Sequence, residues 1–80
     1  MIDNLDFTKI LEKLQPGTKW RIFYNPENIN NKLAHIRAII DDDMVVWRFW
    51  SYQRQNWIYQ VDHIYRFQIL DNDGHLQRVK

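Results

Sequence analysis

The fold depends most on the segment Val45-Val46-Trp47-Arg48-Phe49-Trp50-Ser51-Tyr52, which continues, after a polar turn, as Trp57-Ile58-Tyr59-Gln60-Val61. Its β-branched and aromatic residues are enriched in strands, and the short polar insert favours a hairpin. If Tyr52 pairs with Trp57, then Trp50 faces Tyr59 and Arg48 faces Val61. A slip of one residue would exchange the two faces, so this register is a hypothesis.

Both faces of this hairpin are apolar, which is unusual for an antiparallel sheet with one solvated side. One face holds Arg48, Trp50, Tyr52, Trp57, Tyr59 and Val61; the other holds Val45, Trp47, Phe49, Ser51, Ile58 and Gln60. One face must be the core, and the other is either covered by a helix or exposed as a recognition surface. Aromatic residues beside arginine are typical of binding hot spots and of platforms for unpaired bases. Cross-strand aromatic pairs also serve a purely structural role in hairpins.

Before this hairpin, residues 4–14 are expected to form a short helix. Asp3 is a candidate cap, and Asp6 suits the first helical turn. Gln15-Pro16-Gly17 ends the helix in a type II turn. The apolar face repeats at helical spacing and consists of Phe7, Ile10, Leu11 and Leu14.

The rest of the chain, residues 18–79, is expected to be an antiparallel sheet. Strand patterns occur at 18–24, 33–40, 44–52, 57–61, 64–70 and 76–79. The intervening segments 25–31, 41–43, 53–56 and 71–74 have turn or loop composition, and Asp71-Asn72-Asp73-Gly74 is a strong hairpin signal. The expected class is α+β, mainly β: a short N-terminal helix and a five- to six-stranded antiparallel meander, with twist favouring a curled half-barrel or SH3-like barrel.

Composition indicates a single domain over residues 1–80. The four Trp, four Tyr and four Phe residues supply a dense core for so short a chain. The chain has no cysteine, which fits a reducing compartment. Neither a signal-peptide pattern nor an apolar run of membrane-spanning length occurs, so we expect a cytoplasmic protein without a membrane partner.

Charge is distributed unevenly although the net charge is only +1. Segment 44–61 contains Arg48 and Arg54 and no acid, and segment 16–40 is also basic. The candidate binding residues are Arg48, Trp50, Tyr52, Arg54, Trp57 and Tyr59, with Lys19, Arg21 and Arg37 as further phosphate contacts. The small net charge counts against nucleic acid, because that affinity is largely electrostatic.

The sequence shows no catalytic or metal-binding motif. It has one serine, Ser51, outside any nucleophile motif, and no glycine-rich phosphate loop. His35, His63 and His75 lack metal-ligand spacing, and His35 is expected to be a half-buried strand residue. We interpret Asp41–Asp43 as a solvated turn. No enzyme activity, cofactor or small-molecule substrate is expected.

The stretch from His35-Ile36-Arg37-Ala38-Ile39-Ile40-Asp41 through Val45-Val46-Trp47-Arg48 to Trp57-Ile58-Tyr59 resembles small uncharacterised proteins of bacteriophages and prophages. The resemblance covers about the middle third of the chain and brings no established activity. The resemblance implies a protein located in the cytoplasm of a bacterial host. It favours two roles, nucleic-acid binding and inhibition of a host protein complex by direct binding.

The sequence therefore favours a non-catalytic binding module that acts on nucleic acid or a nucleoprotein through the aromatic and basic hairpin. The alternative is a protein–protein module, such as a phage-encoded inhibitor of a host defence or regulatory complex, with Asp41–Asp43 as an acidic contact. A third interpretation is a homodimer, because edge strands and exposed aromatic faces favour self-association.

Overall fold

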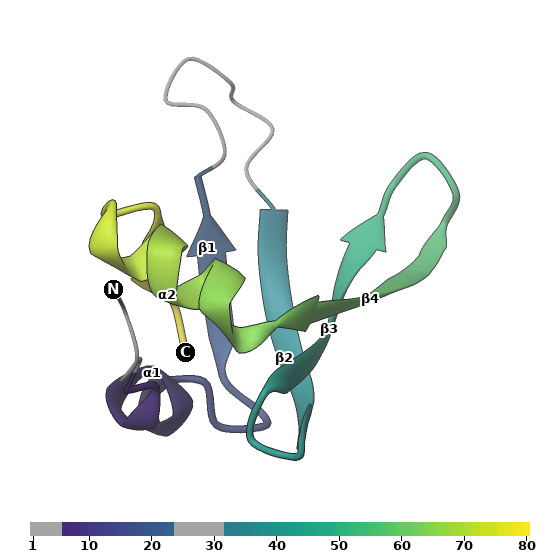
Figure 1. Cartoon of the computed structure of the whole chain (residues 1–80). Helices are drawn as coiled ribbons and strands as arrows, with labels where there is room; N and C mark the ends of the chain where they lie inside the picture. Colours follow the sequence, from purple (N-terminus) through teal and green to yellow (C-terminus); the bar gives the residue numbers. More distant parts are fainter. Residues whose placement is uncertain (1–5, 24–31) are drawn as a thin grey trace.

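The computed structural model describes residues 6–23 and 32–80 (Figure 1). Its elements are α1 (Thr8–Lys13), β1 (Lys19–Ile22), β2 (Lys32–Ile40), β3 (Met44–Ser51), β4 (Asn56–His63), α2 (Ile64–Asn72) and β5 (Leu76–Arg78). The strands form one antiparallel sheet in the order β4-β3-β2-β1-β5. The expected cap Asp3 and loop 25–31 lie outside the described residues.

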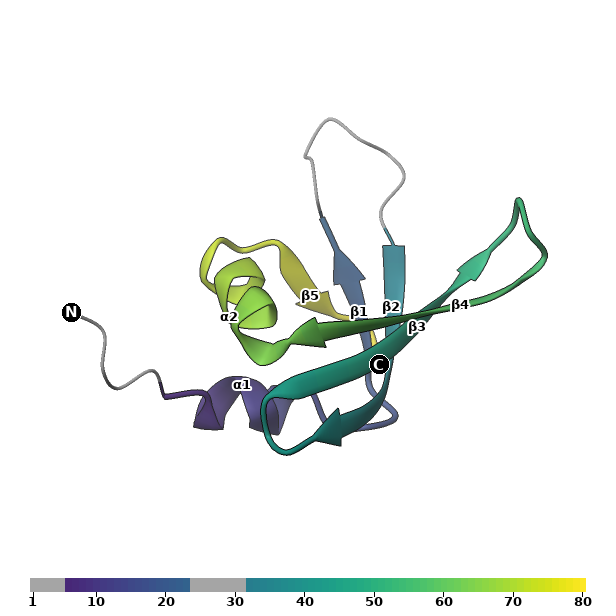
Figure 2. The same cartoon turned by 45° about the vertical axis from the view of Figure 1, so that its right-hand side comes forward.

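The core lies between one face of the sheet and the two helices (Figure 2). In β1, β2 and β3 the buried residues lie two positions apart, so within each strand they point to the same face. The core consists of Ile10, Leu14, Trp20, Ile22, Ala34, Ile36, Val45, Trp47, Ile64, Phe67 and Leu76. Of the two apolar faces of the hairpin, the one with Val45 and Trp47 is therefore the buried one.

The mainly β architecture with a short N-terminal helix is confirmed, but the sheet neither closes into a barrel nor curls into a half-barrel. β5 pairs with the outer side of β1 rather than with β4, so the described sheet stays open with β4 and β5 as its edges. Both helices lie against the face of the sheet that carries the core. The described residues contain five strands, and no helix among them is long and apolar enough to cross a membrane.

The predicted strand at 64–70 is wrong, because Ile64–Asn72 forms helix α2. Its N-terminus is capped by His63, whose Nδ1 accepts a hydrogen bond from the Tyr65 N–H at 3.0 Å. Ile64 and Phe67, three residues apart, are fully buried against the sheet. The buried residues thus follow the spacing of a helix, and the alternation of apolar and polar residues that suggested a strand does not correspond to burial.

The predicted hairpin turn at 71–74 is also wrong, since these residues end α2. The Gly74 N–H donates to the Asp71 carbonyl at 3.1 Å, and the His75 N–H donates to the Leu70 carbonyl at 2.8 Å. This pair of bonds is a Schellman motif, which needs a residue with positive φ, and Gly74 has φ +74°. The same conformational property of glycine that favours hairpins here ends a helix.

Two other predicted turns are confirmed. The Thr18 N–H donates to the Gln15 carbonyl at 3.1 Å with Gly17 at φ +96°, the geometry of a type II turn. Asp41 and Asp42 both have positive φ, and the turn they form joins β2 to β3. Helix α1 begins later than predicted, with the Asp6 carboxylate accepting the Thr8 N–H at 2.9 Å.

The register of the β3–β4 hairpin differs from the predicted one by two residues. Trp50 is opposite Trp57 and Arg48 is opposite Tyr59, because the loop occupies residues 52–55 rather than 53–56. Gln55, at φ +56°, closes this loop. A shift by an even number of residues leaves the residues that stay within the two strands on their predicted faces, whereas Tyr52 falls in the loop.

Beyond Arg48 the hairpin leaves the rest of the sheet. β2 pairs with β3 only from His35 opposite Arg48 to Ile40 opposite Met44, with a register shift at Arg37. Residues 49–58 therefore form a two-stranded arm, visible on the right of Figure 2. The aromatic residues of interest lie where this arm joins the sheet.

Candidate functional site

The face of the sheet opposite the helices carries the candidate site. Partners in register share a face, so one row of side chains can be traced across four strands. The row consists of Lys19, His35, Arg48 and Tyr59. Because the neighbouring residue Trp47 points into the core, this row points away from the helices. Neither helix covers it (Figure 2).

Around Trp57 this face gathers an aromatic and basic group, hereafter the open-face cluster: His35, Arg48, Trp50, Trp57 and Tyr59. The Arg48 guanidinium carbon lies 3.9 Å from the centroid of the Trp57 ring, and Arg48 Nη1 donates to the Tyr59 hydroxyl at 2.9 Å. The His35 and Trp50 rings approach Trp57 edge to face at centroid distances of 5.0 and 5.4 Å. Trp57 therefore contacts three members of the cluster.

Exposure differs among the members of the cluster. Trp50 is 37% exposed and Tyr59 56% exposed, whereas Arg48 and Trp57 are half-buried. Arg48 Nε is buried and has no hydrogen-bond partner. Buried polar atoms are nearly always paired, so an unpaired guanidinium nitrogen is an unusual feature of this surface. The cluster thus combines a fixed cation with accessible aromatic rings.

All charged side chains that the five strands place on the open face are basic. The single carboxylate of the strands, Asp62, lies on the helix side and accepts a hydrogen bond from Trp47 Nε1 at 2.7 Å. Lys19 and Arg21 alternate with buried Trp20 and therefore point to the open face. Arg48 lies on the same face, and Arg37 points there too because it is exposed next to buried Ile36. Local potential here is more positive than the net charge suggests.

His35 lies among these cations. Burial lowers the pKa of His35, and the charges of Lys19, Arg48 and Arg37 lower the pKa further. A bound anion near His35 would offset this repulsion. The pKa of His35 therefore depends on the charges of the open face.

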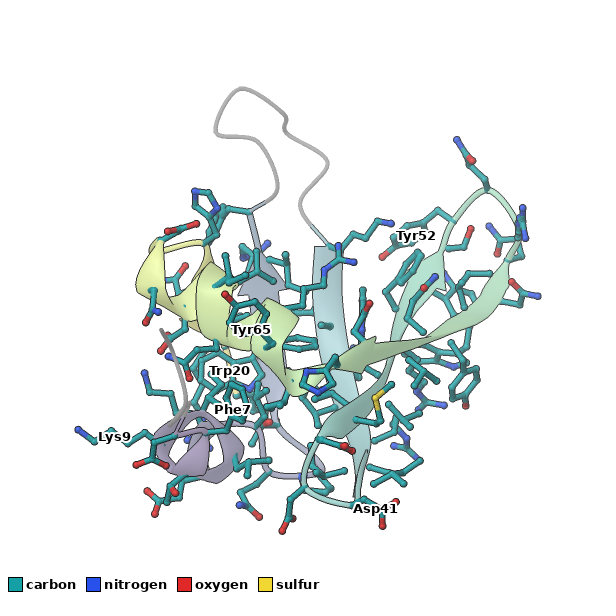
Figure 3. The ribbon with its side chains drawn as sticks, in the orientation of Figure 1. Phe7, Lys9, Trp20, Asp41, Tyr52 and Tyr65 are labelled. Atoms are coloured by element: carbon teal, nitrogen blue, oxygen red, sulfur yellow. The ribbon has the colours of Figure 1, made fainter. Side chains whose placement is uncertain are left out.

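The structure brings together most of the residues predicted from the sequence. Arg48, Trp50, Trp57 and Tyr59 belong to the cluster, with Lys19, Arg21 and Arg37 on the same face. Tyr52 and Arg54 lie instead in the loop at the tip of the arm, where Tyr52 is 80% exposed (Figure 3).

His35 was not among the binding residues predicted from the sequence. The sequence predicted a half-buried strand histidine, and His35 is half-buried in β2. Its position across from Arg48 depends on the β2–β3 register. That register includes a shift at Arg37 that no glycine or proline signals.

Two cavities lie away from the open face. An apolar one of about 550 Å³ is lined by Phe7, His63, Tyr65, Arg66, Ile69 and Leu70. A more polar one of about 330 Å³ is lined by Lys32, Trp47, Gln60, Asp62 and Arg66. Within residues 6–23 and 32–80, no group of three or more histidine or acidic side chains is placed to hold a metal ion. Asp41–Asp43 is an exposed turn.

Comparison of the chain with protein-family models, with curated proteins and with solved structures finds no match. The open-face cluster is therefore interpreted from its own geometry and charge.

Proposed function

We propose that the protein is a non-catalytic binding module that holds single-stranded nucleic acid, free or within a nucleoprotein, on the open face of its sheet. The observation that carries this proposal is the open-face cluster, in which exposed Trp50 and Tyr59 flank an arginine held on Trp57. Sheet faces with exposed aromatic residues bind unpaired bases by stacking. Each stacked base contributes about 1–3 kcal/mol.

The arrangement of the rings favours a single strand over a duplex. The planes of Trp50 and Trp57 are inclined at 78°, so each ring offers its own surface and the pair cannot sandwich one base. Arg48 occupies part of one side of Trp57. Bases stacked on Trp50 and Tyr59 would therefore be splayed apart, which a flexible single strand allows and a stacked duplex does not.

The basic residues beside the cluster supply the electrostatic part of binding. Lys19, Arg21 and Arg37 can each meet one phosphate, since no carboxylate of the strands shares their face. Three such contacts with a single strand predict a slope of about −2 in a plot of log affinity against log salt concentration. This modest slope agrees with a chain of net charge +1.

The test is fluorescence anisotropy of short labelled single-stranded oligonucleotides at two salt concentrations. Trp50→Ala should weaken binding about tenfold or more through loss of one stacking surface. Tyr65→Ala is the matched control, because Tyr65 is an aromatic residue of similar exposure, 42%, on the helix side (Figure 3). Equal affinities for wild type and Trp50→Ala would contradict the proposal.

Phosphate contacts are tested separately by charge removal. Arg37→Gln should lower affinity and reduce the salt slope by about 0.7, whereas Lys9→Gln on α1 should change neither (Figure 3). Parallel effects of the two substitutions would indicate only nonspecific attraction to positive charge.

A protein partner is the alternative that the same surface supports, because exposed tryptophan, tyrosine and arginine are typical hot-spot residues. Given the resemblance to phage and prophage proteins, that partner would be a host defence or regulatory complex in the bacterial cytoplasm. Absence of oligonucleotide binding at low salt would favour it. Capture of one stoichiometric host protein by wild type but not by Trp50→Ala would then support it.

A further inference from the structure

The two free edges of the sheet differ in length and composition. β5 has three residues, includes Arg78, and is followed by residues that bond back to Lys19. Short, charged edges of this kind resist pairing with another chain. β4 has eight residues and contains no lysine, arginine, proline or glycine. The β4 edge therefore lacks the features that usually prevent edge-to-edge association.

Backbone groups of β4 that face the free edge can be identified from one hydrogen bond. The Ile64 N–H donates to the Asp43 carbonyl at 2.6 Å, directly after the last β3–β4 pair, Met44 opposite His63. Hydrogen-bonded and non-hydrogen-bonded pairs alternate along an antiparallel ladder. The residues that bond to β3 are therefore the even-numbered ones, Asn56, Ile58, Gln60 and Asp62.

It follows that the odd-numbered residues Trp57, Tyr59 and Val61 direct their N–H and C=O groups outward. No other strand of the described residues pairs with them, because β4 is the last strand of the sheet. Their side chains lie on the open face, where Tyr59 and Val61 are each 56% exposed. The edge thus presents unpaired backbone groups beside apolar side chains.

We propose that β4 pairs antiparallel with β4 of a second copy of this chain, about a two-fold axis at Tyr59. In this register Trp57 lies opposite the partner's Val61, and Tyr59 lies opposite the partner's Tyr59. Aromatic–aliphatic and aromatic–aromatic cross-strand pairs are favourable, and residues 57–61 carry no charge that would repel its own copy. The edge is therefore complementary to itself, as a two-fold interface requires.

This pairing would join the two sheets into one continuous sheet. A two-fold axis perpendicular to the sheet keeps both open faces on the same side, so the two clusters would lie next to each other across the interface. Dimerisation through the β4 edge does not require that the open face bind nucleic acid.

The test is sedimentation equilibrium of the full chain up to millimolar concentration. Wild type should show twice the chain mass of 9.9 kDa. Val61→Pro removes one outward N–H without disturbing the β3–β4 ladder and should weaken dimerisation at least tenfold. Val61→Thr keeps the N–H and the branched shape, so it should dimerise as wild type does.

Val61→Lys is the second disruptive variant, because it places a charge on the edge and keeps the backbone intact. If Val61→Pro loses its native circular dichroism spectrum, Val61→Lys decides the outcome. A strictly monomeric wild type would overturn the proposal, and so would a dimer that Val61→Lys leaves unchanged. Val61 lies outside the open-face cluster, so oligonucleotide binding by the Val61→Lys monomer separates this result from the proposed function.

Discussion

Arg48 and Trp57 lie on adjacent strands, with the guanidinium carbon 3.9 Å from the centroid of the indole ring. The contact is diagonal, because Arg48 is directly opposite Tyr59. This contact holds the half-buried guanidinium of Arg48, whose Nε has no hydrogen-bond partner. Stacking on the indole therefore supplies part of the stabilisation that hydrogen bonds would otherwise give.

A double-mutant cycle with Arg48→Ala and Trp57→Ala should show a favourable coupling of about 0.5–2 kcal/mol in the free energy of unfolding. Urea denaturation followed by circular dichroism measures it. The control cycle pairs Trp57→Ala with Arg54→Ala, because Arg54 lies in the exposed loop of the arm. Coupling in that cycle should stay below about 0.5 kcal/mol. Equal coupling in both cycles would contradict a specific stacking contribution.

His35 should make stability depend on pH. Its pKa in the folded protein is lower than the ordinary value of 6.5, chiefly through burial and then through Lys19, Arg48 and Arg37. As pH falls below about 6.5, the unfolded chain binds a proton at His35 before the folded chain does, so stability falls. Above that pH this contribution is constant. Urea midpoints measured across this range should show the decline.

His35→Gln should flatten that part of the stability profile, because glutamine does not titrate. An unchanged stability profile in His35→Gln would assign the pH dependence to other groups.

Nucleic-acid binding should show the opposite pH dependence if the proposed function is correct. Bound phosphates would raise the pKa of His35, so affinity for an oligonucleotide should increase as pH falls through the same range.

Asp62 should contribute more to stability than its position near the surface suggests. Its carboxylate accepts the hydrogen bond of Trp47 Nε1, and Trp47 is only 2% exposed. Asp62→Ala leaves that donor unpaired and should destabilise the fold by about 1–3 kcal/mol. Asp71→Ala, which breaks an exposed ion pair with Lys13, should cost less than about 1 kcal/mol. Thermal denaturation of both variants compares the two acids directly, and equal losses would contradict the assigned role.

Gly74 should be sensitive to a side chain for conformational reasons alone. An added Cβ would meet no atom within 4 Å, but φ is +74°. Gly74→Ala should therefore cost about 1–2 kcal/mol. Gly74→Asn should cost less, because asparagine tolerates this conformation better. Urea denaturation distinguishes the two variants, and equal stability of wild type and Gly74→Ala would contradict the Schellman assignment.

Much of the site could be predicted because it depends on alternation along two strands. The residues within the two strands of the hairpin lie on their predicted faces although the predicted register was wrong by two residues, because an even shift does not change the face. Whether the face with Trp50 was exposed could not be predicted. That outcome depends on which side of the sheet the helices occupy, and one of them, α2, was expected to be a strand.

The error at α2 has a physical cause. Tyr65, Phe67 and Ile69 alternate with polar residues as a strand would, and the following Asp71-Asn72-Asp73-Gly74 suits a hairpin equally well. The helix is favoured by the local His63 cap and by burial of Ile64 and Phe67 over the sheet, and that burial requires the sheet to be in place. Local pattern alone cannot distinguish these two structures over nine residues.

The connection of β5 to β1 has a consequence for folding kinetics. The β1–β2, β2–β3 and β3–β4 pairs join neighbours in the sequence, whereas Trp20 and Arg78 are the most widely separated partners of the sheet. Closing so long a loop carries the largest entropic penalty, so the four-stranded meander of β1 to β4 should form before β5 docks. Leu76 should then gain its native contacts late, and conservative substitutions there should mainly accelerate unfolding rather than slow folding.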